Sequence, residues 1–211
     1  MSLWIKICGN TSYEDALLAA EAGADAVGFV FAPSPRRVSF EQVAAITPKL
    51  PSSIEKIGVF VASSFDEIET AVRDCGLTGV QLHFDGVEDL PLRLREQFGP
   101  GLRIVRALHY GPDVMEKIGP AGNESIDAVL IDSRTATVVG GTGTSYDWNA
   151  AQDLFHGGGI RLIVAGGLTH LNVSEAVRKL RPWGVDVVSG VEIIPGRKNP
   201  AKVRAFVKNA R

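Results

Sequence analysis

The sequence predicts an α/β fold of the closed (β/α)8 barrel type, and three observations support this. Short apolar runs rich in Val and Ile recur eight times, each bounded by Gly, Pro, Ser or Asp, as buried strands are. The ends of successive runs lie about 26 residues apart, which leaves room for one loop and one helix. Strands that alternate with helices pair in parallel, and eight such units in 211 residues fit a barrel near its minimum size.

The competing architecture is an open, doubly wound parallel sheet. That fold typically has about five or six units and a G-x-G-x-x-G turn after its first strand. Here Cys8-Gly9-Asn10-Thr11 follows the first apolar run instead. We therefore expect a barrel, with residues 1–211 forming a single catalytic domain, because no segment has the composition of a second domain.

The individual elements are predicted from apolar runs and from helix-start and helix-stop signals. Capping-box patterns at residues 11–14, 39–42 and 64–67 mark the starts of the first three helices. The expected helix C-caps are Gly23, Gly76 and Gly99. The expected strands are residues 3–8, 25–31, 56–61, 79–83, 102–108, 128–132, 161–165 and 185–189. The expected helices are residues 13–22, two segments beginning after Ser39 and Ser64, then 91–98, 114–118, 148–155, 171–180 and 200–210.

The composition indicates a globular protein and excludes several classes. Hydrophobic residues make up 45% of the chain, which excludes disorder, and Lys plus Arg (22) nearly balance Asp plus Glu (24), which excludes a broad nucleic-acid surface. No apolar run approaches the ~20 residues that span a bilayer, and residues 1–6 do not resemble a signal peptide. Two cysteines provide neither a disulfide framework nor a metal cluster. We expect a cytoplasmic protein without a metal, membrane or nucleic-acid partner.

In a barrel of this type the active site is made by residues at the carboxyl ends of the strands. Alternation along the first strand places Lys6 and Cys8 opposite its aliphatic residues, so both should point into the barrel. Lys6 is either an interior ion-pair partner, for instance of Asp186 on the eighth strand, or a functional amine. Cys8 is either a small buried hydrophobe or a catalytic group beside Gly9, whose bare backbone lets a ligand approach.

Polar residues end or follow three other strands. Asp132 ends the sixth strand after three aliphatic residues and is either a cap or a catalytic carboxylate. Gln81 and His83 share a face at the end of the fourth strand, where His83 is either a hydrogen-bonded wall residue or a general base. Arg36 and Arg37 lie in a proline-stiffened loop after the second strand. That loop is either a solvated basic turn or a fork for a carboxylate, because a guanidinium matches that shape.

Glycine clusters follow the last three strands, at residues 140–144, at Gly166-Gly167 and at Ser189-Gly190. Loops after the seventh and eighth strands commonly form a phosphate site in this fold. Bare backbone N–H groups can bind phosphate without a lysine. Turns also use glycine, but three clusters in consecutive late loops indicate a phosphorylated ligand.

Several of these motifs occur together and in a definite order. They are Lys6-Ile7-Cys8-Gly9, Gly28-Phe29-Val30-Phe31 with Ser34-Pro35-Arg36, Val80-Gln81-Leu82-His83, Asp132, Gly140-Gly141-Thr142-Gly143, Asp147-Trp148, Ala165-Gly166-Gly167-Leu168, Ser189-Gly190-Val191-Glu192 and Pro195-Gly196. In this order the chain resembles the phosphoribosylanthranilate isomerase family over nearly its whole length. The resemblance implies a single-domain barrel that uses no cofactor and no metal, acts on a small phosphorylated substrate and is a monomer or a homodimer.

The resemblance also implies a reaction and its residues. The family catalyses an Amadori rearrangement in tryptophan biosynthesis, converting N-(5-phosphoribosyl)anthranilate to the corresponding 1-deoxyribulose aminoketose. Asp132 would be the general acid, Cys8 the general base and Arg36 the group that holds the anthranilate carboxylate. Gln81 and His83 would line the substrate site. The expected phosphate-binding residues are Gly143, Gly166, Gly167, Ser189 and Gly190.

Two other functions are compatible with the motifs. One is a different phosphosugar barrel enzyme with Lys6 as a Schiff-base nucleophile, although the pairing of Cys8 with Asp132 favours proton transfer. The other is a non-catalytic barrel that binds a phosphometabolite. The chain also departs from the family pattern in places: Arg37 stands where an aromatic residue is common, so Arg36 and Arg37 both remain candidates for the carboxylate, and Asn199 replaces a usual Asp.

Overall fold

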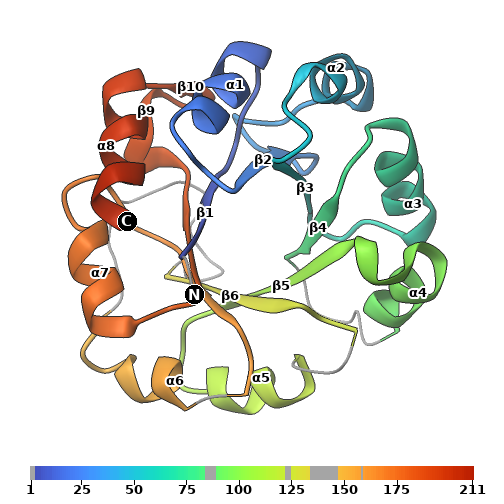
Figure 1. Cartoon of the computed structure of the whole chain (residues 1–211). Coiled ribbons are helices and arrows are strands. Elements are labelled where there is room, and N and C mark those ends of the chain that lie inside the picture. The colour runs from blue at the N-terminus through green and yellow to red at the C-terminus, as the bar shows by residue number, and fades with distance from the viewer. Residues whose placement is uncertain (1–2, 84–88, 122–124, 134–146, 158) are drawn as a thin grey trace.

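The computed structural model describes residues 3–83, 89–121, 125–133, 147–157 and 159–211, and these form a closed barrel of parallel strands (Figure 1). Each strand pairs with the next along the chain, and the last pairs with the first to close the ring. The predicted (β/α)8 architecture is therefore confirmed. The strands are β1 Trp4–Ile7, β2 Ala26–Val30, β3 Glu55–Phe60, β4 Gly79–Leu82, β5 Arg103–His109, β6 Ala128–Asp132, β7 Leu162–Val164 and β8 Gly184–Val187.

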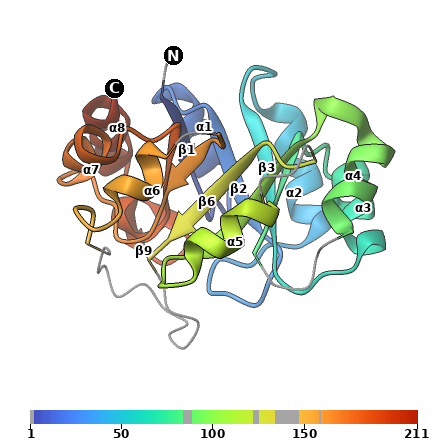
Figure 2. The ribbon, with the colours of Figure 1, turned by 90° about the horizontal axis from the view of Figure 1, so that it is seen from below.

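Helices surround the ring of strands, and Figure 2 shows the same arrangement with both chain ends on one side of the molecule. The carboxyl-terminal Arg211 donates a hydrogen bond from Nη1 to the carbonyl of Leu3 at 2.9 Å, which ties the end of the chain to the start of β1. No helix in the described ranges is long and apolar enough to cross a membrane. The helices are α1 Tyr13–Glu21, α2 Phe40–Ile46, α3 Phe65–Asp74, α4 Leu90–Phe98, α5 Val114–Ala121, α6 Gln152–His156, α7 Val173–Leu180 and α8 Pro200–Ala210, with short 3-10 turns η1 Thr47–Lys49, η2 Gly99–Gly101 and η3 Ser189–Val191.

The apolar side chains form two layers separated by the strands. Trp4 packs inside the ring with small and aliphatic residues such as Ala26 and Ile57. Ile5 and Ile7, which alternate with it along β1, pack outside the ring against the helices. The predicted faces of the first strand are therefore confirmed, and their alternation explains why Lys6 and Cys8 lie inside.

Two of the three predicted capping boxes are confirmed, at the starts of α2 and α3. The prediction for α1 is wrong by one residue. The hydroxyl of Ser12, not Thr11, accepts the amide of Asp15 at 3.2 Å. Thr11 instead donates its hydroxyl to the carbonyl of Gly196 at 2.6 Å, so a long-range contact takes the side chain that the local pattern assigned to the cap. Glu14 accordingly lies one position too early to complete a box.

A small hairpin outside the barrel joins η3 to α8. Its strands, β9 Glu192–Ile194 and β10 Arg197–Lys198, pair antiparallel. Asn199 caps α8 by accepting the amides of Ala201 and Lys202 at 3.0 and 3.1 Å, so the departure from Asp keeps the cap. The hairpin places Glu192 and Lys198 beside the end of β1, where they become part of the site.

Candidate active site

Cys8 follows β1 at the carboxyl end of the barrel and is 3% exposed. Its amide donates to the carbonyl of Val187 on β8 at 2.9 Å, and its own carbonyl accepts Lys198 Nζ at 2.5 Å. Gly28 on β2 provides the space for the thiol. A Cβ added there would stand 2.5 Å from Cys8 Sγ and 3.0 Å from the Cε of Lys6.

Lys6 is buried inside the barrel, where its ammonium group bonds to two other inward-facing side chains. Its Nζ donates to Asp186 Oδ1 at 2.9 Å and to Gln81 Oε1 at 2.8 Å. This confirms the ion pair between the first and eighth strands. Burial opposes the charge of Lys6, but Asp186 and Cys8 outweigh it and raise the pKa of the ammonium above its usual range. The amine is therefore protonated at neutral pH and has no lone pair for attack on a carbonyl.

Opposing effects act on the pKa of the Cys8 thiol. Burial raises its pKa and so does Asp186, while the charges of Lys6 and Lys198 lower it, and the net direction is upward. The second cysteine, Cys75, is buried on the outside of the barrel, where its thiol contacts the carbonyl of Phe40 at 3.4 Å. Burial raises the pKa of Cys75 to about 11, so this thiol is chemically quiet at neutral pH.

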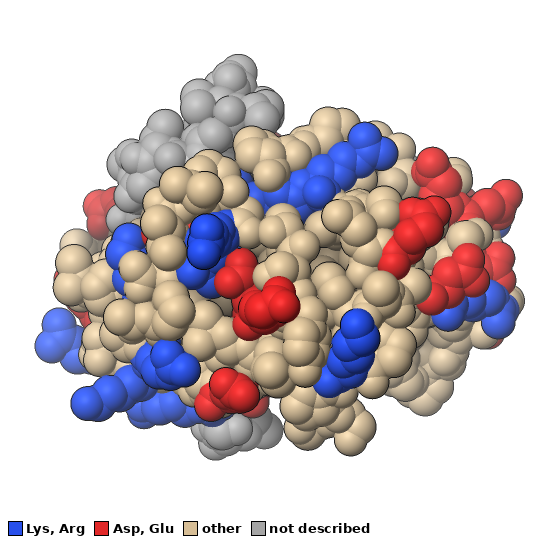
Figure 3. Space-filling view, turned by 90° about the horizontal axis from the view of Figure 1, so that it is seen from above, with Lys and Arg blue, Asp and Glu red and all other residues tan. Residues whose placement is uncertain are grey.

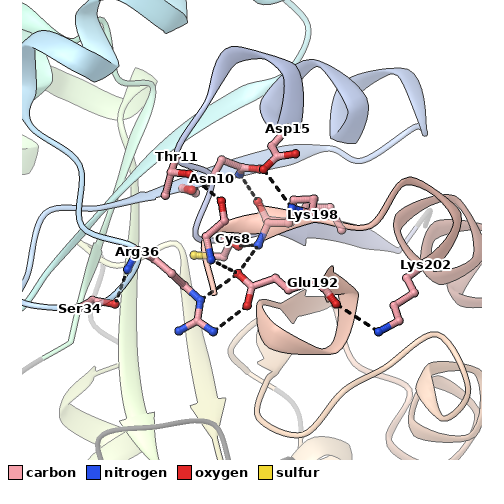
Figure 4. A network of polar contacts seen from close by, with 12 residues as sticks. Cys8, Asn10, Thr11, Asp15, Ser34, Arg36, Glu192, Lys198 and Lys202 are labelled. Atoms are coloured by element: carbon pink, nitrogen blue, oxygen red, sulfur yellow. Dashed lines mark hydrogen bonds and ion pairs between the residues drawn. The ribbon is translucent and has the colours of Figure 1, made fainter. Parts of the chain in front are cut away.

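Arg36 lies in the loop after β2 and is buried, whereas Arg37 is exposed. The Arg36 guanidinium forms a two-pronged ion pair with Glu192, from Nε to Oε1 at 2.9 Å and from Nη2 to Oε2 at 2.7 Å. The third nitrogen, Nη1, points away from Glu192 (Figure 4). The edge that Nη1 forms with Nη2 is thus the edge that an incoming carboxylate would meet.

Glu192 is the centre of a buried charge cluster. Besides Arg36, its Oε1 accepts the amide of Gly196 at 3.1 Å and Lys198 Nζ at 3.2 Å (Figure 4). Burial opposes the carboxylate, but the hydrogen bonds from Arg36 and the charges of Lys198 and Arg36 prevail and lower the pKa of Glu192. Burial lowers the pKa of Lys198, against the opposing charges of Glu192 and Cys8. The sequence patterns give neither residue a role, although Glu192 belongs to the motif Ser189-Gly190-Val191-Glu192.

Asp132 ends β6 and is 8% exposed. Its register partner on β5 is His109, whose ring lies 5.0 Å from the ring of His83, so the ends of β4, β5 and β6 adjoin here. Gly166 lies against the same carboxylate, because an added Cβ would stand 2.6 Å from Asp132 Oδ1. β7 and β8 separate β6 from β1 around the ring, so Asp132 and Cys8 lie on different sides of the barrel mouth. No sequence pattern predicts a role for His109.

The glycines after β7 and β8 have backbone geometry that side chains would disturb. Gly166 and Gly167 have φ angles of +78° and +66°, in the region that favours glycine. Gly190 lies in η3, where an added Cβ would collide with the carbonyl of Leu168. The two loops therefore touch each other, with Ser189 at the start of η3. Gly143, the fifth expected phosphate ligand, lies outside the described residues.

Described residues also line cavities at the opposite, amino-terminal end of the barrel. One, of about 500 Å³, is lined by Leu3, Trp183 and others, and one of about 280 Å³ is lined by residues that include Glu55 and Arg103. Within the described ranges, three or more His, Cys, Asp and Glu side chains do not gather as a metal site would require. Because the acid and base candidates all lie at the carboxyl end, we place the chemistry there.

Comparison with known proteins agrees with this geometry. The family model described as N-(5'phosphoribosyl)anthranilate (PRA) isomerase matches residues 5–209. The N-(5'-phosphoribosyl)anthranilate isomerase of Trichlorobacter lovleyi is 41% identical over 208 residues, covering 98% of this chain and 97% of that protein. The crystal structure of phosphoribosyl anthranilate isomerase from Thermotoga maritima aligns with a TM-score of 0.87 at 34% identity, covering 99% of this chain and 98% of that one.

A further solved structure is of phosphoribosyl anthranilate isomerase in complex with reduced 1-(o-carboxyphenylamino)-1-deoxyribulose 5-phosphate. It aligns with a TM-score of 0.83 at 33% identity and covers 99% of this chain and 98% of that chain. The closed barrel and these matches define a (β/α)8-barrel isomerase. The chain belongs to the N-(5'-phosphoribosyl)anthranilate isomerase family, and its reaction is the isomerisation of that compound in tryptophan biosynthesis.

Proposed function

We propose that Cys8 is the general base and Asp132 the general acid of this isomerisation, and that Arg36 receives the substrate carboxylate. One observation carries the proposal: Cys8 and Asp132 are both buried at the carboxyl ends of strands that β7 and β8 separate around the ring. A sugar bound over the barrel mouth would therefore have an acid on one side and a base on another.

The chemistry needs those two groups in sequence. Asp132 protonates the ring oxygen of the ribosyl group as the ring opens, and the bond from C1 to the anthranilate nitrogen becomes a protonated Schiff base. The Cys8 thiolate then removes the proton from C2, and the electron pair of that C–H bond neutralises the iminium. The resulting enolamine tautomerises to the aminoketose, so no cofactor or oxidant is required. General acid and base groups each contribute typically ~10²–10⁴-fold.

The remaining expected residues serve binding. We infer that the backbone amides of Gly166, Gly167 and Gly190, the hydroxyl of Ser189 and Gly143 hold the phosphate. The close approach of the loops after β7 and β8 supports this, since it brings the backbone of both loops together in one place. His83 would line the substrate site from the end of β4. The carbonyl oxygen of Gln81 accepts a hydrogen bond from Lys6 at 2.8 Å, so Gln81 would line the site with its side chain held by that contact.

The proposal also covers the location and assembly of the enzyme. We place it in the cytoplasm as a single-domain monomer or homodimer that takes a small phosphorylated substrate.

A Schiff-base mechanism through Lys6 is disfavoured because that amine is buried, charged and bonded to Asp186 and Gln81. Borohydride trapping of a sugar phosphate on Lys6 would instead support the Schiff-base mechanism.

The proposal is tested by substituting the two cysteines in turn. We expect Cys8→Ala to lower kcat by at least ~10²-fold while the variant still binds product, because it lacks the general base. Cys75→Ala is the matched control, since Cys75 is equally buried but lies among the outer helices. The loss of phosphoribosylanthranilate fluorescence measures turnover. If Cys8→Ala keeps the wild-type kcat, Cys8 is not the base. If Asp132→Asn keeps the wild-type kcat, Asp132 is not the acid.

A further inference from the structure

We propose that Glu192 determines the enzyme's preference for a carboxylate-bearing substrate by positioning Arg36. Glu192 holds the Nε–Nη2 edge of the guanidinium and leaves the Nη1–Nη2 edge to receive the carboxylate on the aromatic ring of the substrate. The inference rests on the proposed role of Arg36 and extends it to a residue that never touches the substrate.

The geometry of the pair fits a positioning role. A guanidinium carries five N–H donors in one plane, and a carboxylate accepts two of them in parallel. Glu192 takes one donor from Nε at 2.9 Å and one from Nη2 at 2.7 Å. The donors on the remaining edge are still coplanar with it, so Glu192 fixes the plane in which a second carboxylate must bind. Arg36 then loses little side-chain freedom when substrate arrives.

Glu192 is itself held from several sides, which is what a positioning group requires. Its Oε1 also accepts the Gly196 amide at 3.1 Å and Lys198 Nζ at 3.2 Å, and Lys202 Nζ donates to its backbone carbonyl at 3.1 Å. The residue is 6% exposed. A carboxylate with these four side-chain hydrogen bonds cannot turn without leaving buried donors unpaired, which is costly.

The charges of the cluster favour an incoming anion. Arg36 and Lys198 are cations that both pair with the Glu192 carboxylate, so these three side chains together carry a single net positive charge. Glu192 alone would repel a substrate carboxylate, and Lys198 offsets that repulsion. Lys198 also donates to the Cys8 carbonyl at 2.5 Å. Lys198 therefore links Glu192, which positions Arg36, to the backbone of the proposed base.

A purely structural clamp is the competing explanation, because the pair also joins the loop after β2 to the β9–β10 hairpin. The chain offers a matched control in Glu55 and Arg103, a two-pronged pair with distances of 2.6 and 2.7 Å at the amino-terminal end. Loss of that pair removes a similar clamp far from the proposed site. Glu55→Gln should therefore affect stability and leave ligand preference unchanged.

The experiment compares two ligands by calorimetry. The first is reduced 1-(o-carboxyphenylamino)-1-deoxyribulose 5-phosphate, and the second is its phenylamino counterpart, which lacks the ring carboxylate. We expect wild type to prefer the first by on the order of 10–100-fold in Kd, as charged hydrogen bonds allow. Glu192→Gln should lower that preference at least about fivefold, with the Kd of the second ligand unchanged. Glu192→Asp, which keeps the charge, should restore part of the preference.

The outcomes separate this inference from the proposed function. If Arg36→Met keeps the full preference, Arg36 does not receive the carboxylate and the proposed function fails at that residue. If Arg36→Met loses the preference but Glu192→Gln keeps it, only the role of Glu192 is overturned. If the folded Glu192→Gln and Glu192→Asp variants weaken both ligands equally, Glu192 is a clamp and the proposal is wrong.

Discussion

Lys6 on the inner face of β1 and Cys8, which directly follows β1, each change the pKa of the other. Burial raises the pKa of the thiol, and Lys6 is the strongest influence that lowers it. A general base must be deprotonated, so kcat/KM should rise with pH until the pKa of Cys8 is passed. If Cys8 is the base that we propose, the buried ion pair of Lys6 with Asp186 affects the chemistry as well as the packing.

Lys6→Met should move the rising limb of the pH–kcat/KM profile to higher pH. Removal of the cation leaves burial and Asp186 to raise the pKa of the thiol further, so the thiolate fraction at pH 7 falls about tenfold for each pH unit that the limb moves. Lys56→Met is the control, because Lys56 is also buried but bonds the Pro51 carbonyl near the start of β3. An unchanged profile in Lys6→Met would remove Lys6 from the mechanism.

The buried ion pairs of the site differ in whether they could be predicted from the sequence. The pair of Lys6 with Asp186 was predictable because a closed barrel makes β1 and β8 neighbours, and their register aligns the two residues. The pair of Arg36 with Glu192 was not predictable in the same way, because Glu192 lies in a hairpin outside the repeating pattern. Neither local spacing nor alternation places that hairpin against the loop after β2.

At the scale of elements, β2 shows why a strand in this barrel carries a glycine. Gly28 lies beside the end of β1, and its missing side chain leaves the volume that the Cys8 thiol and the Lys6 stem occupy. The strands and most helix starts were predictable from apolar runs and caps. The role of Gly28 was not, because the tight contact is with another strand.

Gly28→Ala should impair catalysis more than stability. The added methyl group would stand 2.5 Å from Cys8 Sγ, so the thiol must move, and misplacement of a reacting group by about 1 Å can cost ~10²-fold in rate. Overpacking also destabilises by typically ~1–3 kcal/mol. Gly101→Ala is the control, since no atom lies within 4 Å of its added Cβ. Equal kcat values for Gly28→Ala and wild type would contradict this prediction.

For the whole molecule, charge is spread rather than concentrated. The face in Figure 3 carries both signs of charge, in keeping with the formal net charge of −2. The substrate carries a carboxylate and a phosphate, and we propose that a few buried donors, rather than a basic surface, match its charge. Composition could exclude a nucleic-acid surface, but only the structure shows that Arg36, Lys198 and Glu192 share one buried cluster.

Global stability should depend on pH through that cluster. The pKa of Glu192 is lower in the folded protein than its ordinary value of 4.5, so its stabilising effect is complete above pH 4.5. As pH falls, the unfolded chain takes up the proton first, and the stabilisation is lost as pH falls through the lowered folded pKa. Glu192→Gln should therefore lose less unfolding free energy than wild type between pH 6 and pH 3, measured by urea denaturation. Parallel curves would refute this contribution.

The pairing of β1 with β8 also determines at what stage of synthesis the active site can form. Asp186 leaves the ribosome 180 residues after Lys6, and Glu192 and Lys198 follow later still. Until then the ammonium of Lys6 must stay in water, because an unpaired charge is too costly to bury. A nascent chain can form helices and neighbouring strands, but the thiol of Cys8 acquires its surroundings only after β8, β9 and β10 have been made. We therefore expect ribosome-stalled chains that lack β8 to be inactive intermediates.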